Sequence, residues 1–453
     1  MGAPLERSLG AWSAMLLTVG AMVGTGILAT PTLVAKATSS PALFVALWIA
    51  GGVVSLLGAF TYAELGTRKP ETGGLFVYLR DAFHPLVAFV FGWTMLVVLV
   101  PSSVAFFAQV TGSHLGPPIA AVTGADPWTV SLIVSLVALL LIALVNVLGG
   151  ARGGAVLQNA ATILKVVGLG FLVVLALLLV LGGPGATTVV EAPVPSPPPE
   201  TADVSWLAVI AALVPVFWAY DGWIDVTSVA GELRNPERDV PRSLVWGVLA
   251  VTFLYLIVSG AFLAALGAAS LARTEAPALE LARATLGPSG PSVAAAIAAT
   301  CTFGAGAVGL MSGARVVYAM ARDGNLFAFV ARADRHGSPS AAVGVTSVLA
   351  LGYLVIPQLG SLAATFVVGA WPFYALGALA LLVLRARGSS DSPLTYRTPL
   401  YPFTVLAFVA ASLAVVGSYA IENPAHTALS FGLALLGLPI GLLRGTGSTR
   451  STH

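Results

Sequence analysis

Long, almost uninterrupted runs of apolar residues constrain this chain more than any other feature of its sequence. The clearest lie at residues 43–60, 129–148, 163–182, 243–267 and 341–356. A run of about 18–20 apolar residues is long enough to cross the hydrocarbon core of a bilayer as a helix. Only 9% of the residues are charged, whereas soluble domains usually carry about 25%. The sequence therefore predicts an all-α integral membrane protein, because lipid offers no partners to open backbone groups.

The apolar pattern predicts twelve transmembrane helices. The first continues past Gly26 without a cleavage site, so it is interpreted as a span and not as a signal peptide. In chain order, the predicted spans lie near 11–36, 41–65, 85–112, 127–149, 155–182, 205–231, 242–267, 292–321, 339–357, 360–384, 401–419 and 425–444.

The 21 basic residues predict the orientation of these spans. If the N-terminus is cytoplasmic, only Lys36, Arg273 and Arg283 fall on outer segments, Lys165 falls inside a span, and all the others are cytoplasmic. Such an excess of basic residues on one side follows the positive-inside rule. We therefore expect a multi-pass protein of the cell membrane with both termini in the cytoplasm.

The connecting segments carry few signals. The stretch PVPSPPPE within 183–204 predicts a stiff extracellular connector. Residues 68–84 predict a short amphipathic cytoplasmic helix after a Gly-Gly turn. Cys301 is the only cysteine and lies in a span, so we expect no disulfide-linked accessory subunit. The sequence contains no nucleophile–His–acid set, metal-ligand spacing or phosphate loop, so it predicts no enzyme, no metal, no cofactor and no nucleic-acid partner.

Two spans contain interruptions that a membrane anchor would not need. They are Gly20–Gly26 in the first span and Phe217–Trp223 in the sixth. Interrupted helices at matching places in two halves of a transporter mark its binding site. Glycines in a membrane helix can instead serve close helix packing. A mid-membrane aspartate, here Asp221, is costly and usually functional, which favours broken helices over packing alone.

Broken helices expose backbone groups that suit an amino acid. With the predicted orientation, the outer half of the first span begins near Gly24–Gly26, and its free N–H groups suit a carboxylate. The outer half of the sixth span ends near Trp218–Ala219, where free carbonyls suit an ammonium group. We expect the side chain of such a ligand to lie against Trp218 and Tyr220.

An ordered set of motifs along nearly the whole chain resembles the amino acid–polyamine–organocation superfamily, and within it the L-amino acid transporter family. The motifs are GAMVGTGILATP (20–31), TYAELGTRKPETGGLFVYLRDAF (61–83), LQNAATILKVVGLG (157–170), FWAYDGWIDVTSVAGELRNPERDVPRS (217–243) and ARVVYAMARDGNLF (314–327). The resemblance implies a 5+5 inverted repeat (11–182 and 205–384) with the first and sixth helices broken, followed by two additional helices (401–444). It also implies alternating access and sodium-independent exchange of neutral amino acids.

The resemblance also assigns residues of the substrate site. It implies that the carboxylate-binding residues are Val23, Gly24, Thr25 and Gly26. It implies that Phe217, Ala219 and Tyr220 supply carbonyls to the amine, and that Trp218 covers the substrate on the outer side. The motif Trp218-Ala219-Tyr220-Asp221-Gly222 is similar to that of the branch that also accepts cationic amino acids.

Lys165 lies about ten residues into the fifth span, which is about 15 Å deep at 1.5 Å per residue. The resemblance implies that it acts as a built-in cation where sodium-coupled relatives bind an ion. Gly313 and Ala314 stand where many members have serines, which argues against a sodium site. Backbone carbonyls near Gly304–Gly306 or in the first span could receive Lys165, and Asp225 either pairs with it or faces the inner vestibule.

The sequence leaves alternatives to a sodium-independent exchanger. Proton-coupled amino acid uptake on the same fold would use Lys165 or Asp221 as a group that changes protonation. A nutrient sensor built on a permease scaffold is disfavoured, since such sensors carry long cytoplasmic extensions and the tails here are about ten residues each.

Overall fold

The computed structural model of this chain describes residues 5, 7–38, 40–148, 150–182, 206–334, 337–355, 362–388 and 396–443. The proline-rich connector predicted at 183–204 lies outside these residues. Within them, helices dominate, and the only strand-like pairing is a single bridge between Leu9 and Leu233.

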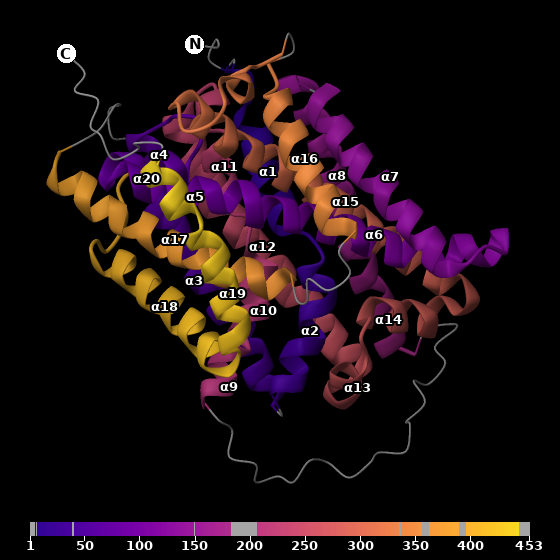
Figure 1. Cartoon of the computed structure of the whole chain (residues 1–453). Coiled ribbons are helices and arrows are strands. Elements are labelled where there is room, and N and C mark those ends of the chain that lie inside the picture. The colour runs from indigo at the N-terminus through magenta and orange to yellow at the C-terminus, as the bar shows by residue number, and fades with distance from the viewer. Residues whose placement is uncertain are drawn as a thin grey trace.

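The helices pack side by side as a bundle (Figure 1). Those before the connector are α1 (Ala11–Met22), α2 (Gly26–Ala37), α3 (Pro41–Arg68), α4 (Leu75–Ala82), α5 (Pro85–Thr94), α6 (Val100–Thr123), α7 (Pro127–Leu148) and α8 (Gly150–Val180). Those after it are α9 (Trp206–Ala211), α10 (Leu213–Tyr220), α11 (Asp225–Ser228), α12 (Pro236–Leu266), α13 (Ala268–Arg273), α14 (Pro277–Leu286), α15 (Gly290–Arg322), α16 (Ser340–Val355), α17 (Leu362–Ala386), α18 (Phe403–Glu422), α19 (Pro424–Leu435) and α20 (Gly437–Leu443).

The lengths of these helices confirm a polytopic membrane protein. In the described part of the chain, nine helical stretches are long and apolar enough to cross a bilayer, and the pair α1 and α2, bent by 42°, makes a tenth. The sixth and ninth predicted spans correspond to shorter apolar helices at Val209–Tyr220 and Ser340–Leu354. The full count of twelve therefore stays a prediction.

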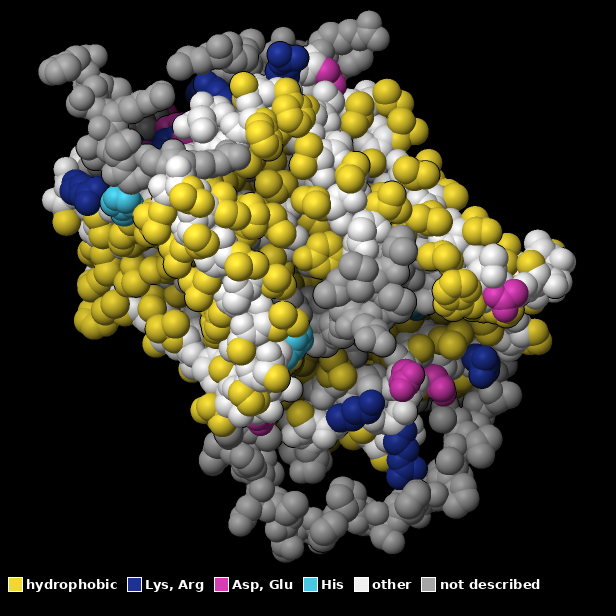
Figure 2. Space-filling model, viewed as in Figure 1, with side chains coloured by type: hydrophobic (Ala, Val, Ile, Leu, Met, Phe, Trp, Pro, Cys, Tyr) yellow, Lys and Arg dark blue, Asp and Glu magenta, His cyan; other side chains and the backbone are white. Residues whose placement is uncertain are grey.

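The surface of the bundle is mostly apolar, as contact with a bilayer requires, whereas its interior also holds polar and charged groups. Figure 2 shows apolar side chains over most of the visible surface, with charged side chains gathered toward its ends. Large aromatic residues are fully buried between the helices, among them Trp48, Trp223 and Trp371. Lys165 is also fully buried. The centre of the bundle thus combines aromatic packing with one deeply placed ammonium group.

The short helix predicted after the Gly-Gly turn is present as α4. Gly73 and Gly74 precede it with φ of +117° and +51°, a conformation that L side chains rarely adopt and that glycine permits. At its end, Arg80 lies 3.1 Å from the Asp323 carboxylate beyond α15. The prediction for this segment is therefore confirmed as a helix, and it is held to the neighbouring bundle by charge pairs.

Candidate functional site

The first predicted break separates α1 from α2. Val23 leaves the helical conformation with φ −75° and ψ 92°, and three residues separate Met22, the end of α1, from Gly26, the start of α2. A helix that stops in the membrane leaves its last carbonyls without intrahelical partners. Here the Lys165 ammonium donates to the Gly20 carbonyl at 2.8 Å, and the Tyr255 hydroxyl lies 2.7 Å from the Met22 carbonyl. Side chains from two other helices thus satisfy the end of α1.

Lys165 joins three helices at this point. It comes from α8, reaches the end of α1, and packs against α15, where an added Cβ on Gly304 would lie 2.3 Å from the Lys165 Cε. A cation at the C-terminal end of a helix also faces the negative end of the helix dipole. Of the partners left open by the sequence, the structure selects the Gly20 carbonyl for the ammonium and places Asp225 on the wall of a cavity instead.

The second predicted break follows α10. The Asp221 N–H donates to the Trp218 carbonyl at 3.2 Å, Gly222 takes φ +101°, and the four-residue helix α11 begins at Asp225. A Cβ on Gly222 would lie 2.7 Å from the carbonyl carbon of Ala21. Position 222 therefore requires glycine for two reasons: its φ is positive, and the two broken segments touch at this point.

Close packing also explains Gly26, the glycine that the sequence assigns to ligand approach. A Cβ at Gly26 would lie 2.4 Å from the Ala219 Cα, so α2 and α10 touch backbone to backbone at this point. The packing interpretation therefore applies at Gly26, and its role toward a ligand stays a prediction. A side chain at Gly26 would therefore disturb the packing of α2 on α10.

Tyr255 is a residue of the site that the sequence analysis missed. Its hydroxyl lies 2.7 Å from the Met22 carbonyl and 3.0 Å from the Ala219 carbonyl, so one hydroxyl serves the ends of both α1 and α10. The sole signal in the sequence is a tyrosine in the middle of the apolar helix α12. One acceptor position of the Ala219 carbonyl, which the resemblance assigns to a ligand amine, is thus already engaged.

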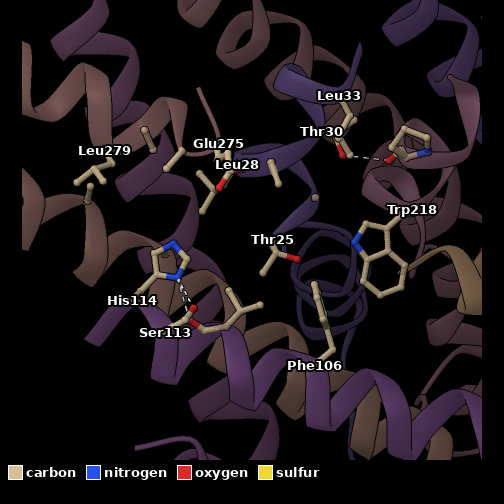
Figure 3. Close-up of a pocket in the computed structure, with 18 of the residues that line it drawn as sticks. Thr25, Leu28, Thr30, Leu33, Phe106, Ser113, His114, Trp218, Glu275 and Leu279 are labelled. Atoms are coloured by element: carbon tan, nitrogen blue, oxygen red, sulfur yellow. Dashed lines mark hydrogen bonds between the residues drawn. The ribbon is translucent and has the colours of Figure 1, made fainter. Parts of the chain in front are cut away.

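Two cavities meet at the breaks. The larger, about 1120 Å³, lies among α2, α6, α10, α14 and α15; Figure 3 shows Thr25 and Trp218 at one side of it and His114 and Leu279 at the other. The smaller, about 90 Å³, lies on the other side of the breaks. Thr25, Gly26 and Trp218 line both cavities and form the boundary between them.

The Trp218 ring lies at this boundary. It packs against Phe106, Phe107 and Phe366 with ring centroids 5.7, 6.1 and 5.3 Å away. The Thr30 hydroxyl of α2 donates to the Pro215 carbonyl of α10 at 3.1 Å (Figure 3), which ties the outer parts of the two broken helices together.

The predicted site residues divide into two groups. Those that line a cavity are Gly24, Thr25, Gly26, Trp218, Asp221 and Gly222. Val23, Phe217, Ala219 and Tyr220 line neither. The Phe217 ring stacks on Trp371 with centroids 3.9 Å apart, and the Tyr220 hydroxyl donates to the Trp48 carbonyl at 3.0 Å. The sequence places the Tyr220 ring against a ligand; the structure instead directs it into the aromatic packing of α3.

Charge pairs close the bundle at the end that the sequence predicts to be cytoplasmic. Glu64 of α3 accepts from Arg385 of α17 at 2.8 Å and from the Thr398 N–H at 2.7 Å. Glu232 accepts from Arg315 of α15 at 2.7 Å. These pairs join segments far apart in the chain and hold this end of the bundle together.

The comparisons with known proteins agree with this geometry. A family model described as amino acid permease matches residues 9–439. The chain therefore belongs to the amino acid permease family, and its resemblance to the amino acid–polyamine–organocation superfamily is confirmed.

Curated relatives give the same class over most of their length. The chain is 28% identical to the serine/threonine exchanger SteT of Bacillus subtilis (strain 168), with 96% of each chain aligned. It is 30% identical to the b(0,+)-type amino acid transporter 1 of Oryctolagus cuniculus, over 84% of this chain and 76% of the relative. It is 25% identical to the human cystine/glutamate transporter, over 96% and 84%. Amino acid transport is the function that this membership supports.

Proposed function

We propose that this protein is a secondary transporter that exchanges L-amino acids across the cell membrane by alternating access. Its twelve helices would form two inverted five-helix halves, 11–182 and 205–384, with two further helices at 401–444. The observation that carries the proposal is the contact between the two helix breaks, at the boundary of two cavities on opposite sides. Such an arrangement lets one site face either side in turn.

The backbone at the two breaks would hold the main-chain groups that every amino acid shares. The first N–H groups of α2, near Thr25 and Gly26, have no intrahelical acceptors and would bind the carboxylate. Carbonyls at the end of α10 would accept from the ammonium, with the Ala219 carbonyl shared with Tyr255. Trp218 would cover the substrate from the larger cavity.

Sodium independence follows in this proposal from Lys165. Its ammonium occupies the end of α1, beside α15, which is where the resemblance locates the sodium ion of coupled relatives. Two cations a few ångströms apart repel strongly at low dielectric. A sodium ion would therefore have no place beside this ammonium.

The basic residues set the orientation of the protein in the membrane in this proposal. With both termini cytoplasmic, the end with Glu64 and Arg385 would face inward and the larger cavity would face outward.

Proton-coupled uptake is the second candidate, and a specific observation favours it. Asp221 and Asp225 both line the smaller cavity, and Lys165 is fully buried close by in the same core. Buried ionisable groups in membrane segments often serve as proton relays.

Uptake of labelled amino acids into proteoliposomes tests the proposal and separates the two candidates. Exchange requires that preloaded unlabelled amino acid accelerates uptake, and that replacing sodium by choline leaves the rate unchanged. Uptake that follows an imposed proton gradient without internal amino acid would favour proton coupling. Ligand binding without any transport, in a folded protein, would overturn the proposal in favour of a sensor.

A further inference from the structure

The segment between α15 and α16 carries two large exposed aromatic rings side by side. Phe327 is 64% exposed and Phe329 is 48% exposed. Their rings stack with centroids 6.1 Å apart and 20° between the ring planes. The next residue, Val330, is only 3% exposed and packs into the apolar core of the bundle. The segment is therefore amphipathic, with Val330 holding it to the bundle and the aromatic pair Phe327 and Phe329 facing away from it.

This segment lies where the chain leaves the membrane. α15 ends at Arg322, α16 starts at Ser340, and a 3₁₀ turn at Ala328–Ala331 packs against both helices. The 33 residues of α15 make a helix about 50 Å long at 1.5 Å per residue. The hydrocarbon core of a bilayer is about 30 Å thick, so the end of α15 and the aromatic pair beyond it reach the membrane surface. The basic residues predict that this surface is the cytoplasmic one.

Two arginines flank the aromatic pair. Arg322 and Arg332 are both exposed, and neither forms an ion pair with any residue that the structure describes. Of the carboxylates in the same segment, Asp323 pairs with Arg80 at 3.1 Å, and Asp334 accepts a backbone N–H of its own turn at 3.0 Å. The segment thus presents two positive charges without counter-charges, one on each side of an apolar face.

This combination matches anionic phospholipid headgroups better than a protein partner. Apolar rings insert at the boundary between headgroups and acyl chains, and basic side chains beside them are attracted to anionic lipids. The guanidinium group binds phosphate oxygens through two parallel N–H donors. A stable protein interface buries about 800 Å² on each partner, which is more than two aromatic rings on one short turn can supply.

We propose that this segment is a docking surface for anionic phospholipids of the cytoplasmic leaflet, formed by Phe327, Phe329, Arg322 and Arg332. The two rings insert below the headgroups, and the two guanidinium groups bind the phosphates around them. Because the segment continues directly from α15, this contact fixes the depth of α15 in the membrane. The inference goes beyond the proposed function and does not depend on the substrate.

The test is a fluorescent label attached to Ala328→Cys in the full-length protein in proteoliposomes. Ala328 is exposed between the two rings, and the native Cys301 is fully buried, so the label reacts at the new cysteine. Quenching is compared between brominated phosphatidylglycerol in plain phosphatidylcholine and brominated phosphatidylcholine in plain phosphatidylglycerol, at equal brominated content. Both lipids should quench the label, with phosphatidylglycerol preferred by about fivefold or more, which is the contribution of one basic residue near an anionic surface.

Two pairs of substitutions separate charge from apolar insertion. Arg322→Gln combined with Arg332→Gln should bring the preference close to one, whereas lysine at both positions should keep most of it. Phe327→Ser combined with Phe329→Ser should lower quenching by both lipids, because the label leaves the interface, whereas leucine at both positions should keep it. A matched control is Arg273→Gln, at an exposed arginine that ends α13 on the predicted outer side, and it should change nothing.

Three results would overturn the docking surface. A label that neither brominated lipid quenches would place the segment in water. Equal quenching by both lipids would remove the preference for anionic headgroups. A loss in Arg273→Gln as large as in the double arginine variant would show an effect of net charge alone. None of these measurements requires transport, so a protein without uptake activity leaves this inference standing, and a failed docking surface leaves the proposed function standing.

Discussion

The two helix breaks differ in what they present to a ligand. The first, between α1 and α2, contains no charged residue, and its exposed carbonyls are held by Lys165 and Tyr255. The second, between α10 and α11, contains Gly222 at φ +101° and presents the carboxylates Asp221 and Asp225 to a cavity. The first break is thus a backbone surface held by side chains of other helices, and the second presents two carboxylates.

This difference suggests that the first break recognises the groups shared by all amino acids and that the second break selects among their side chains. Backbone N–H groups at the first break suit the carboxylate that all amino acids share, so changes there should affect every substrate alike. If the proposed function is right, the side chains of the second break would lie where substrates differ from one another, so changes there should affect substrates unequally.

Lys165→Met should have the largest effect. It removes the charge that holds the Gly20 carbonyl while it keeps an unbranched chain against Gly304. Without the ammonium, α1 is no longer tied to α8 and α15 during the cycle, so transport of arginine and alanine should both fall at least about a hundredfold. Initial rates in proteoliposomes measure this, with a melting curve in detergent as the check of folding.

Lys36→Met is the control for that variant, since Lys36 is exposed at the end of α2 and its loss should change little. Normal rates in a folded Lys165→Met variant would show that the first break does not depend on the ammonium. A loss confined to arginine would place Lys165 with the selecting residues of the second break.

Trp218→Ala should have the next largest effect. Its ring lines both cavities and packs on Phe106 and Phe366. Burial of an aromatic side chain contributes about 1–3 kcal/mol, so substrate binding should weaken by about 5- to 150-fold for every substrate tested. Affinities within twofold of wild type would mean that the ring does not cover the substrate, and Trp128→Ala, at a tryptophan that is 70% exposed, serves as the control.

The sequence predicted the overall plan better than the side-chain directions. Apolar runs and the positions of glycines determined where spans and breaks occur, because both depend on local composition. The direction of the Tyr220 ring and the contact between Gly26 and Ala219 depend on which helices meet in space, and nothing local in the sequence encodes that. Lys165 was found because a charge in an apolar run stands out, whereas Tyr255 was missed because a tyrosine does not.

Tyr255→Phe should give the smallest effect and the most direct test of the division between the breaks. The Tyr255 hydroxyl serves the Met22 and Ala219 carbonyls together, and phenylalanine keeps the ring while it removes that single donor. A buried hydrogen bond contributes about 0.5–1.5 kcal/mol, so transport should fall by about 2- to 12-fold. Because both carbonyls belong to the backbone, arginine and alanine should be affected by the same factor. Tyr353→Phe also removes one tyrosine-to-carbonyl hydrogen bond, to Val97 at 2.9 Å, and it lies away from the breaks, so it should leave the rates unchanged. If Tyr255→Phe instead changed the ratio of arginine to alanine uptake, the two breaks would act as one recognition surface, and the assignment of selection to Asp221 and Asp225 alone would be wrong.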